Sequence, residues 1–343
     1  MNKIVVRTPN HLGDCLMALP AVKALALNSD QYEISLLMPR WAETILAGIP
    51  RTGFLFLESD DLHGYWAIQS QIRLLRQNRY NSGILLTPSF SSALIFFLAG
   101  FKKRTGYRSD WRGFLLNDIM DRPASIVHRA RLYHKLIEHF AGRELPVESP
   151  HINLIPANAD KAGKLMQEHG LASSDRFIAV APQAVAESRR WGADNYASLS
   201  RRIIEQREAR IVLLGTIAEQ AAGEKVKNGQ KEIINLCGLT NIGTAAAILR
   251  QAALFIGNDS GLAHLAATVQ IPIVVLSGAD NPAETSPLSD RKIVIIKDRL
   301  PCISCVKNIC PKRGDDFMRC MREAEIVWKL CRLVISGSSI INR

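Results

Sequence analysis

The sequence lacks the glycine-rich signatures of the two commonest classes of nucleotide-binding enzyme. No G-x-x-x-x-G-K-[ST] segment occurs in its 343 residues, which excludes a P-loop NTPase. A dinucleotide-dependent dehydrogenase needs G-x-G-x-x-G after its first strand and an acidic residue at the end of the next strand. The first predicted loop has one glycine, Gly13, and the second predicted strand ends in Met38-Pro39-Arg40. A dehydrogenase is therefore disfavoured.

The sequence also lacks a signal peptide and a clear membrane span. Met1-Asn2-Lys3 leads directly into the apolar run Ile4–Val6. The one uncharged run of membrane length, residues 83–101, is interrupted by Pro88 and by Ser and Thr residues. A strand over residues 84–86, a loop and a buried helix over residues 91–99 explain it better than a span. We expect a cytoplasmic protein that does not cross a membrane but can contact its cytoplasmic face.

Acidic residues are outnumbered in this chain. It has 43 Lys and Arg against 32 Asp and Glu, a formal net charge of +11. Such an excess suits an anionic partner, such as a phosphorylated metabolite or an acidic membrane surface. The basic residues are scattered and form no single tail, so a nucleic-acid partner is not expected.

Cysteine is limited to seven residues, and four of them fall close together near the end of the chain. Cys302, Cys305, Cys310 and Cys320 have the spacing C-x2-C-x4-C-x9-C. Four thiolates can close a tetrahedral zinc site. The second pair lacks the usual short spacing and the segment is rich in Lys and Arg, so buried thiols or a labile disulfide are favoured over zinc. Both interpretations stay open.

Strand-like and helix-like segments alternate along the chain, which predicts the α/β class with two doubly wound domains. The first domain is expected over residues 1–155 and the second over residues 175–322. Prolines and short polar segments between residues 142 and 175 predict a linker. Residues 323–343 are expected to form a helix that packs back on the first half. A ligand cleft is expected between the carboxyl edges of the two sheets.

The segment Gly257–Ala267 is the most informative one. It follows an apolar strand-like run and enters an alanine-rich helix, so it lies where open α/β sheets bind ligands. Asp259 and Ser260 are good N-cap residues, and Gly261 allows a ligand to approach the backbone. The first-turn N–H groups then favour an anion such as a diphosphate. An ordinary turn from strand to helix is the alternative.

Three further strand-to-helix loops carry charged side chains. Asp14 follows the first strand and is a candidate general base, although it could simply cap its helix. Arg189 and Arg190 suit the oxygens of a phosphate, or form a solvated basic loop. Glu219 could accept hydrogen bonds from sugar hydroxyls, but Glu is ordinary at the start of a helix.

Basic residues are interleaved with aromatic residues in the first half. This pattern is typical of a surface for an acidic glycan or lipid, or of solvated amphipathic faces. The basic residues are Lys102, Lys103, Arg104, Arg108, Arg112, Arg122, Arg129 and Arg131.

Several motifs, in order along nearly the whole chain, resemble the bacterial ADP-heptose:lipopolysaccharide heptosyltransferases, glycosyltransferase family 9, and most of all the heptosyltransferase II branch. The motifs are Asn10-His11-Leu12-Gly13-Asp14 with Met17-Ala18-Leu19-Pro20, Ser91-Ser92-Ala93-Leu94, Arg104-Thr105-Gly106-Tyr107-Arg108, Leu115-Leu116-Asn117-Asp118, Gly257–Gly261 with His264–Ala267, and the cysteine-rich tail through Cys320-Met321.

The resemblance implies the GT-B architecture, in which two Rossmann-like domains face each other across a cleft. It implies transfer of a heptose from ADP-L-glycero-D-manno-heptose to the lipid A–inner core acceptor, the second heptose onto the first, by a metal-independent inverting displacement. Asp14 would be the general base. The donor site would include Arg189, Glu219, Asp259, Ser260, Gly261 and His264; the acceptor site would include Asn10, Arg104 and Arg108.

Two departures from the family pattern keep another donor open. The family usually has Lys-Arg-Trp-Pro where this chain has Arg189-Arg190-Trp191-Gly192. A guanidinium differs in geometry from an ammonium, so the phosphate contact differs. The preceding residues 183–187 also lack a glycine-rich run. A related transferase that uses another nucleotide sugar, or adds another heptose, is the alternative.

Overall fold

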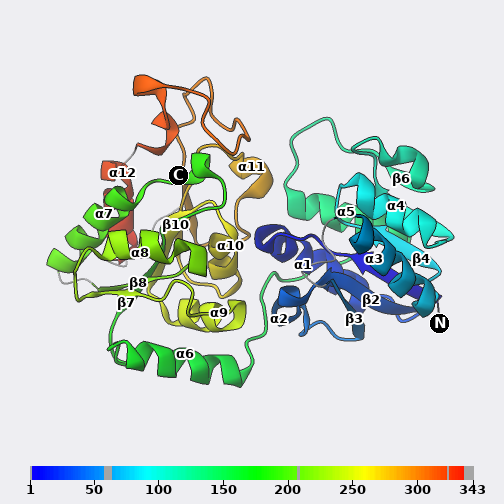
Figure 1. Ribbon diagram of the computed structural model, residues 1–343, viewed down its shortest axis with the longest axis horizontal. Coiled ribbons are helices and arrows are strands. Elements are labelled where there is room, and N and C mark those ends of the chain that lie inside the picture. The colour runs from blue at the N-terminus through cyan, green and yellow to red at the C-terminus, as the bar shows by residue number, and fades with distance from the viewer. Residues whose placement is uncertain (1, 58–63, 207–208, 323, 336–343) are drawn as a thin grey trace. The chain divides into compact units, whose positions relative to one another are not determined.

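The chain forms two six-stranded parallel sheets (Figure 1). The structure is a computed structural model that describes residues 2–57, 64–206, 209–322 and 324–335. Contacts divide the chain into two compact units, Met1–Ile152 and Asn153–Arg343. The predicted α/β class with two doubly wound sheets is confirmed.

The first unit is built on a sheet in the order β3-β2-β1-β4-β5-β6. Its strands are β1 (Asn2–Arg7), β2 (Tyr32–Pro39), β3 (Thr52–Leu57), β4 (Ser82–Leu85), β5 (Lys103–Tyr107) and β6 (Asp118–Met120). Its helices are α1 (Leu12–Leu27), α2 (Glu43–Leu46), α3 (Tyr65–Asn78), α4 (Phe90–Leu98) and α5 (Arg129–Ala141), with 3-10 turns η1 (Arg40–Ala42) and η3 (Arg112–Leu115).

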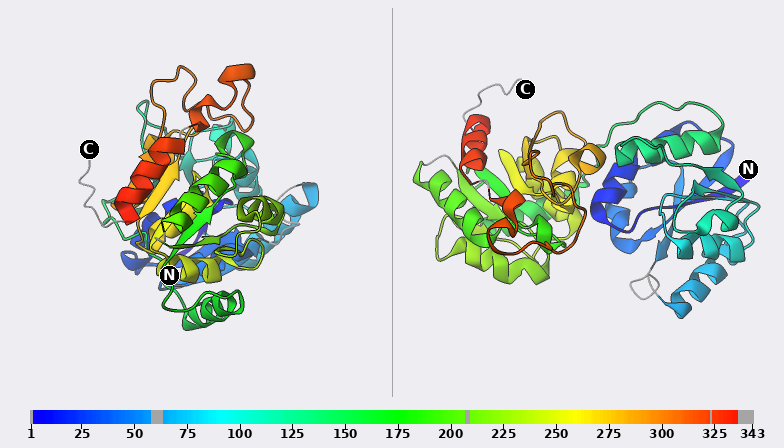
Figure 2. Two further views of the ribbon diagram at one scale, coloured as in Figure 1. Left: turned by 90° about the vertical axis from the view of Figure 1, so that its left-hand side faces the viewer. Right: turned by 90° about the horizontal axis from the view of Figure 1, so that it is seen from above.

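Helices cover both faces of this sheet (Figures 1 and 2). Helix α1 packs against α5, and α3 packs against α4. The central strand β1 is buried on both faces, because Ile4, Val5 and Val6 alternate sides and none is exposed. Each such side chain contributes roughly 1.5–3 kcal/mol of burial free energy, which fixes the strand that carries the first candidate site.

The second unit has the sheet order β12-β11-β10-β7-β8-β9. Its strands are β7 (Phe177–Ala181), β8 (Arg210–Leu213), β9 (Ile233–Asn235), β10 (Leu254–Asn258), β11 (Ile273–Leu276) and β12 (Lys292–Ile295). Its helices are α6 (Pro156–Glu168), α7 (Ala193–Glu205), α8 (Gln220–Lys227), α9 (Ile242–Gln251), α10 (Gly261–Thr268), α11 (Pro282–Thr285) and α12 (Ala324–Ile335). The 3-10 turns are η4 (Glu187–Arg189), η5 (Ile217–Glu219), η6 (Gly314–Asp316) and η7 (Arg319–Met321).

The last helix packs on the second unit, so the prediction that it returns to the first half is wrong. Val327, Trp328 and Cys331 of α12 belong to the core of the second unit. Arg202 of α7 lies 5.0 Å from the ring centroid of Trp328 and pairs with Glu325. An amphipathic pattern predicts an apolar face but does not say which core covers it. Residues 323 and 336–343, also part of the prediction, lie outside the described residues.

The uncharged run over residues 83–101 forms the end of strand β4, a loop and helix α4, as predicted. Ser89 caps α4 by accepting a hydrogen bond from the Ser92 backbone N–H, which begins the helix directly after Pro88. Among the described residues, no helix combines the length and the apolar character that a membrane span requires.

Candidate active site

The first candidate site lies where the order of the first sheet reverses. Strands β1 and β4 are neighbours there, and the loop from β1 to α1 leaves the carboxyl edge of the sheet. Arg7 at the end of β1 is buried and donates to the Thr8 carbonyl (2.6 Å) and to Asn10 Oδ1 (2.7 Å). Burial lowers the pKa of Arg7 to about 10, so it stays a cation at neutral pH. Asn10 is therefore held by a buried guanidinium.

Asp14 lies in the first turn of α1, and the N-cap of that helix is His11. The alternative that Asp14 simply caps the helix is therefore wrong. Arg129 Nη1, from the first residue of α5, donates to Asp14 Oδ1 at 2.5 Å. The side chain of Asp14 is 20% exposed, so this carboxylate reaches solvent while it is held from the side.

Tyr133 lies one turn further along α5, beside this ion pair. Burial and the nearby negative charge of Asp14 raise the pKa of Tyr133 well above its ordinary value. The phenol is thus neutral at any physiological pH and adds no second base to this site.

The two arginines predicted to bind the acceptor are already engaged within the first unit. Arg104 on β5 donates from Nε to the Leu115 carbonyl (2.7 Å) and from Nη1 to the Phe101 carbonyl. Its guanidinium also lies 5.3 Å from the ring centroid of Phe97. Arg108 Nε pairs with Asp121 Oδ1 at 2.7 Å.

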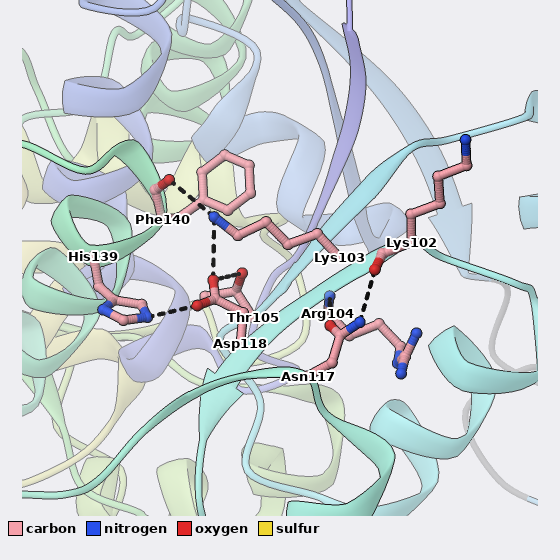
Figure 3. A network of polar contacts seen from close by, with 8 residues as sticks. All are labelled: Lys102, Lys103, Arg104, Thr105, Asn117, Asp118, His139 and Phe140. Carbon is pink, nitrogen blue, oxygen red and sulfur yellow. Dashed lines mark hydrogen bonds and ion pairs between the residues drawn. The ribbon is translucent and has the colours of Figure 1, made fainter.

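A polar network beside Arg104 joins β5, β6 and α5 (Figure 3). Asp118 accepts from Thr105 Oγ1 (2.6 Å), pairs with Lys103 Nζ (3.2 Å) and bonds His139 Nε2 (2.8 Å). Burial works against ionisation of Asp118, but hydrogen bonds from Thr105, His139 and Lys103 outweigh it and lower its pKa. Because every member is engaged with another, this network stabilises the edge of the sheet.

The second candidate site lies where the order of the second sheet reverses, between β10 and β7. Ser260 is the N-cap of α10, yet its side chain makes no capping hydrogen bond, and its Oγ is buried without a partner among the described residues. The first-turn N–H groups of α10 are therefore not used by this side chain. Asp259 and His264 on either side of this turn are both buried.

Asn258, at the end of β10, ties two loops together. Its Oδ1 accepts from the Trp191 backbone N–H (3.0 Å) and from the Tyr196 hydroxyl (3.1 Å). Its own amide nitrogen, Trp191 Nε1 and Ser277 Oγ are buried without hydrogen-bond partners in the described part of the chain. Leaving such groups unpaired costs about 1–3 kcal/mol each, so these atoms are available to hydrogen-bond another molecule.

Hydrogen bonds and an ion pair hold the loop that contains the two predicted phosphate-binding arginines. Arg190 donates to the Ala184 carbonyl (2.8 Å) and the Val185 carbonyl (3.2 Å). Arg189 Nε pairs with Asp280 Oδ2 at 2.6 Å, and Asp280 lies after β11. Arg189 is therefore held beside the sheet edge by a carboxylate, whereas Arg190 is exposed, as the alternative of a solvated basic loop expects.

Glu219 has a structural role. The Thr216 backbone N–H donates to its Oε2 at 2.7 Å, and the two residues form a reciprocal capping box at η5. A Cβ on Gly215 would lie 2.7 Å from the same oxygen, so a larger residue there would displace the Glu219 carboxylate.

The four clustered cysteines come together around one pocket in the second unit. Cys302, Cys305, Cys310 and Cys320 line it, and its empty volume is about 390 Å³. Burial and the other three thiols raise the pKa of Cys320. All seven cysteines are free, and among the described residues no three candidate ligands stand close enough to hold a metal as they are.

Sequence reasoning did not assign the roles of three residues of these sites: Arg129, Asn258 and Asp280. Arg129 lies 115 positions from Asp14, and Asp280 lies on a different loop from Arg189, so no local pattern links either pair. Asn258 was visible as part of the donor segment. Its position at the end of a buried strand could have indicated an organising role.

The chain is similar to known proteins of one family. The family described as "Glycosyltransferase family 9 (heptosyltransferase)" matches residues 68–314. Lipopolysaccharide heptosyltransferase 2 of Escherichia coli is 31% identical over 311 residues, covering 85% of this chain and 87% of that protein. Lipooligosaccharide heptosyltransferase 2 of Haemophilus influenzae is 28% identical over 305 residues, covering 85% and 88%.

Two solved structures share the fold along nearly the whole chain. The E. coli ADP-heptose lipopolysaccharide heptosyltransferase II matches with a TM-score of 0.78 and 24% identity, covering 98% of this chain and 99% of that one. The family 9 glycosyltransferase of Veillonella parvula matches with a TM-score of 0.83 and 20% identity, covering 98% of both. The chain therefore belongs to glycosyltransferase family 9, the heptosyltransferases.

Proposed function

We propose that this glycosyltransferase moves a heptose from ADP-L-glycero-D-manno-heptose onto the first heptose of the lipopolysaccharide inner core. The names of its relatives support this donor and acceptor. The observation that carries the proposal is the set of buried polar atoms without partners, Asn258 Nδ2, Ser260 Oγ, Ser277 Oγ and Trp191 Nε1, at the carboxyl edge of the second sheet. They offer hydrogen bonds to a ligand at the start of α10.

The second unit is assigned to the donor. The N–H groups in the first turn of α10 and the Ser260 hydroxyl bind the diphosphate, and the helix dipole stabilises the charge that builds on ADP as it leaves. Arg189 adds a positive charge oriented by Asp280. Asp259, Gly261 and His264 complete the donor loop, and Glu219 contacts the sugar or ribose from η5.

The first unit is assigned to the acceptor, with Asp14 as general base. The acceptor hydroxyl oxygen attacks the anomeric carbon, the bond from that carbon to the diphosphate oxygen breaks, and Asp14 takes the hydroxyl proton. Attack opposite the leaving group inverts the anomeric centre. Since Arg129 engages Oδ1 of Asp14, we assign the proton to Oδ2. This displacement uses no metal, and Asn10, Arg104 and Arg108 contact the anionic core.

A membrane surface is the expected setting for this acceptor. Phe90, Leu94, Phe97 and Leu98 share one side of α4 at helical spacing, and three of them are exposed. Phe114 of η3 packs on Phe90 at 6.1 Å between ring centroids. We define these five residues as the α4 face. An exposed apolar face beside cationic side chains suits an anionic lipid surface, and we place peripheral contact with the inner membrane there.

A related reaction with another nucleotide sugar, or with another heptose acceptor, is the second candidate. Gly192 has φ +100°, a conformation that proline cannot adopt because its ring holds φ near −65°. The loop therefore follows a different backbone path from the Lys-Arg-Trp-Pro loop usual in the family. Because Trp191 next to it bonds Asn258, this difference reaches the donor edge.

The test is ADP release with ADP-heptose and a lipopolysaccharide acceptor truncated after its first heptose, followed by product mass. The proposal expects a gain of one heptose. ADP release with other ADP- or UDP-sugars but not ADP-heptose would instead support the second candidate. The acceptor preparation is checked beforehand with an enzyme known to extend it.

A further inference from the structure

The segment over residues 299–322 has little regular secondary structure. It follows β12 and contains only the short turns η6 and η7. Most of its side chains are exposed, including Val306 and Ile309. Small segments of this kind usually need a disulfide or a metal ion to supply the order that a hydrophobic core cannot. All four of its cysteines are free thiols.

We propose that Cys302, Cys305, Cys310 and Cys320 bind one thiophilic divalent metal ion, of the zinc or iron(II) class, and that this ion fixes two loops of the donor site. The four side chains enter one pocket from a stretch of nineteen residues. The remaining cysteines, Cys15, Cys237 and Cys331, are buried elsewhere. Tetrahedral sets of four thiolates are typical of zinc and iron sites.

The backbone around the first pair is wound as a tight knuckle. Ser304 and Val306, on either side of Cys305, have φ +55° and +54°. A β-branched residue seldom adopts this conformation, and it persists only where the surroundings hold it. At the other end of the segment the Met318 N–H points at Cys310 Sγ (3.5 Å), an N–H to sulfur contact that also suits a thiolate ligand.

The charge of the segment suits a bound ion. Four thiolates around a divalent cation carry a net charge of −2. Residues 299–322 contain six basic and two acidic side chains, and Lys312 and Arg319 line the same pocket. In the sequence, these basic residues were an argument against zinc. Their positive charge offsets the net negative charge of a metal ion bound by four thiolates.

The thiols must close inward to bind. A metal–sulfur bond is about 2.3 Å long, and in the described residues no three ligands stand at that spacing. Because the four side chains line one shared pocket, rotation about their χ1 bonds can bring the thiols toward its centre. In the absence of a cation the thiolates repel one another, and the ion removes that repulsion.

The knuckle is bonded to the loop after β11. The Ser304 N–H donates to the Gly278 carbonyl (2.9 Å), the Val306 N–H to the Ala279 carbonyl (2.7 Å), and Ser304 Oγ to the Asp280 carbonyl (3.0 Å). A Cβ on Gly278 would lie 2.9 Å from Cys320 Sγ, so the glycine admits the fourth thiol. Asp280 is the residue that orients Arg189.

The segment is also bonded to the Arg189 loop itself. The Ser188 backbone N–H donates to the Asn308 carbonyl (3.0 Å), and Ser188 Oγ donates to the Lys307 carbonyl. An ion that orders residues 302–320 thus holds both partners of the Arg189–Asp280 pair. Metal binding itself is independent of the proposed function; only its effect on ADP rests on the donor assignment.

The first test is metal content. The full chain is purified without chelator under anaerobic conditions and analysed for zinc and iron by mass spectrometry. We expect about one ion per chain, and loss of most of it in Cys302→Ser and Cys320→Ser. Cys331→Ala removes a thiol from the same unit and should keep the ion. Content below about one ion in ten chains, or content unchanged by both serine variants, would overturn the site.

A second measurement does not depend on variants that fold. The parent chain is stripped with a chelator and titrated with Co²⁺. Sulfur-to-cobalt charge-transfer absorption that saturates at one equivalent supports four-thiolate binding. If the charge-transfer absorption is absent and the thiols can be alkylated only after reduction, the cysteines form a disulfide and the proposal is overturned. Stripped protein should bind ADP several-fold more weakly than reloaded protein; equal affinity would overturn the link to the donor loops and leave the metal result standing.

Discussion

At the scale of single residues, Asp14 is the sharpest test of the chemistry. Asp14→Asn keeps the shape of the side chain and its contact with Arg129 but cannot take a proton. We expect transfer to slow by about a hundredfold or more, the usual contribution of a general base. ADP affinity, measured by calorimetry, should stay unchanged because the donor loop lies in the other unit. A variant that retains near-normal turnover would remove Asp14 from the mechanism.

The substitution Ser260→Ala is expected to affect ADP binding and the free energy of unfolding in different ways. Its hydroxyl is buried without a partner, so Ser260→Ala should leave the free energy of unfolding unchanged or raise it. The same change should weaken ADP binding by about tenfold or more, the worth of a hydrogen bond to a charged group. Urea unfolding and ADP titration measure the two effects.

Asn241→Ala is the matched control for Ser260→Ala. Asn241 does cap its helix, accepting from the Thr244 N–H at 2.8 Å. The Asn241→Ala variant should therefore lose about 1 kcal/mol of unfolding free energy and bind ADP as tightly as the parent chain. If Ser260→Ala behaves like this control, Ser260 is an ordinary cap and contributes nothing to the donor site.

The residues of the candidate sites were easier to predict than the residues that hold them in place. Asp14, Arg189 and Ser260 follow strands, so the alternation of strand and helix was enough to bring them to a sheet edge. The partners of Asp14 and Arg189 come from elements distant in the sequence, helix α5 and the loop after β11. A sequence pattern of period 2 or 3.6 contains no information about contacts such as Asp14 with Arg129.

At the scale of elements, the network around Asp118 predicts a pH dependence. The folded-state pKa of Asp118 is lowered, so its contribution to stability is present above the unfolded pKa, near 4, and is lost as pH falls through the folded value. Asp118→Asn should cost about 1 kcal/mol at pH 7 and less at pH 3. Urea unfolding at both values measures it.

Asp160→Asn, on an exposed position of α6, is the control for that pH dependence. Its unfolding free energy should follow the parent chain at both pH values. If the cost of Asp118→Asn were the same at pH 3 as at pH 7, ionisation of Asp118 would not stabilise the edge of the sheet.

The strands of the two sheets show which elements an apolar sequence pattern can predict and which it cannot. Apolar strands such as β7 and β11 can be recognised from continuous apolar runs, because both faces of a parallel strand are buried. Strands β5 and β6 were missed: they are short, they lie at one end of the sheet, and Lys103, Arg104 and Asp118 interrupt any apolar pattern. The charges of Lys103 and Asp118 are satisfied by one another, which no local rule predicts (Figure 3).

At the scale of the whole molecule, net charge does not select a surface. The first unit has 18 basic and 13 acidic residues, a net charge of +5, and the second unit carries the remaining +6. The basic character predicted for the first half is thus shared by both. What distinguishes the α4 face is the combination of exposed Phe97 and Leu98 with Arg104 stacked on the Phe97 ring and Arg76 bonded to the Leu98 carbonyl.

This combination predicts binding to anionic membranes. The parent chain should sediment with phosphatidylglycerol vesicles, less with phosphatidylcholine vesicles, and less as salt screens the attraction. The double variant Phe97→Ser, Leu98→Ser should bind about tenfold more weakly, since it removes roughly 1.4 kcal/mol or more of apolar burial. Val147→Ser, an exposed apolar residue of the same unit, is the control and should bind like the parent.

Activity then separates a docking face from a catalytic one. On a soluble acceptor without acyl chains the double variant should match the parent chain, because the α4 face contacts lipid and not the reacting hydroxyl. On acceptor embedded in vesicles it should be slower in proportion to its weaker binding. Equal vesicle binding by the double variant and the parent, with folding verified by thermal unfolding, would assign the membrane contact to another surface. The exposed aromatic residues of α4 would then have no role in reaching the acceptor.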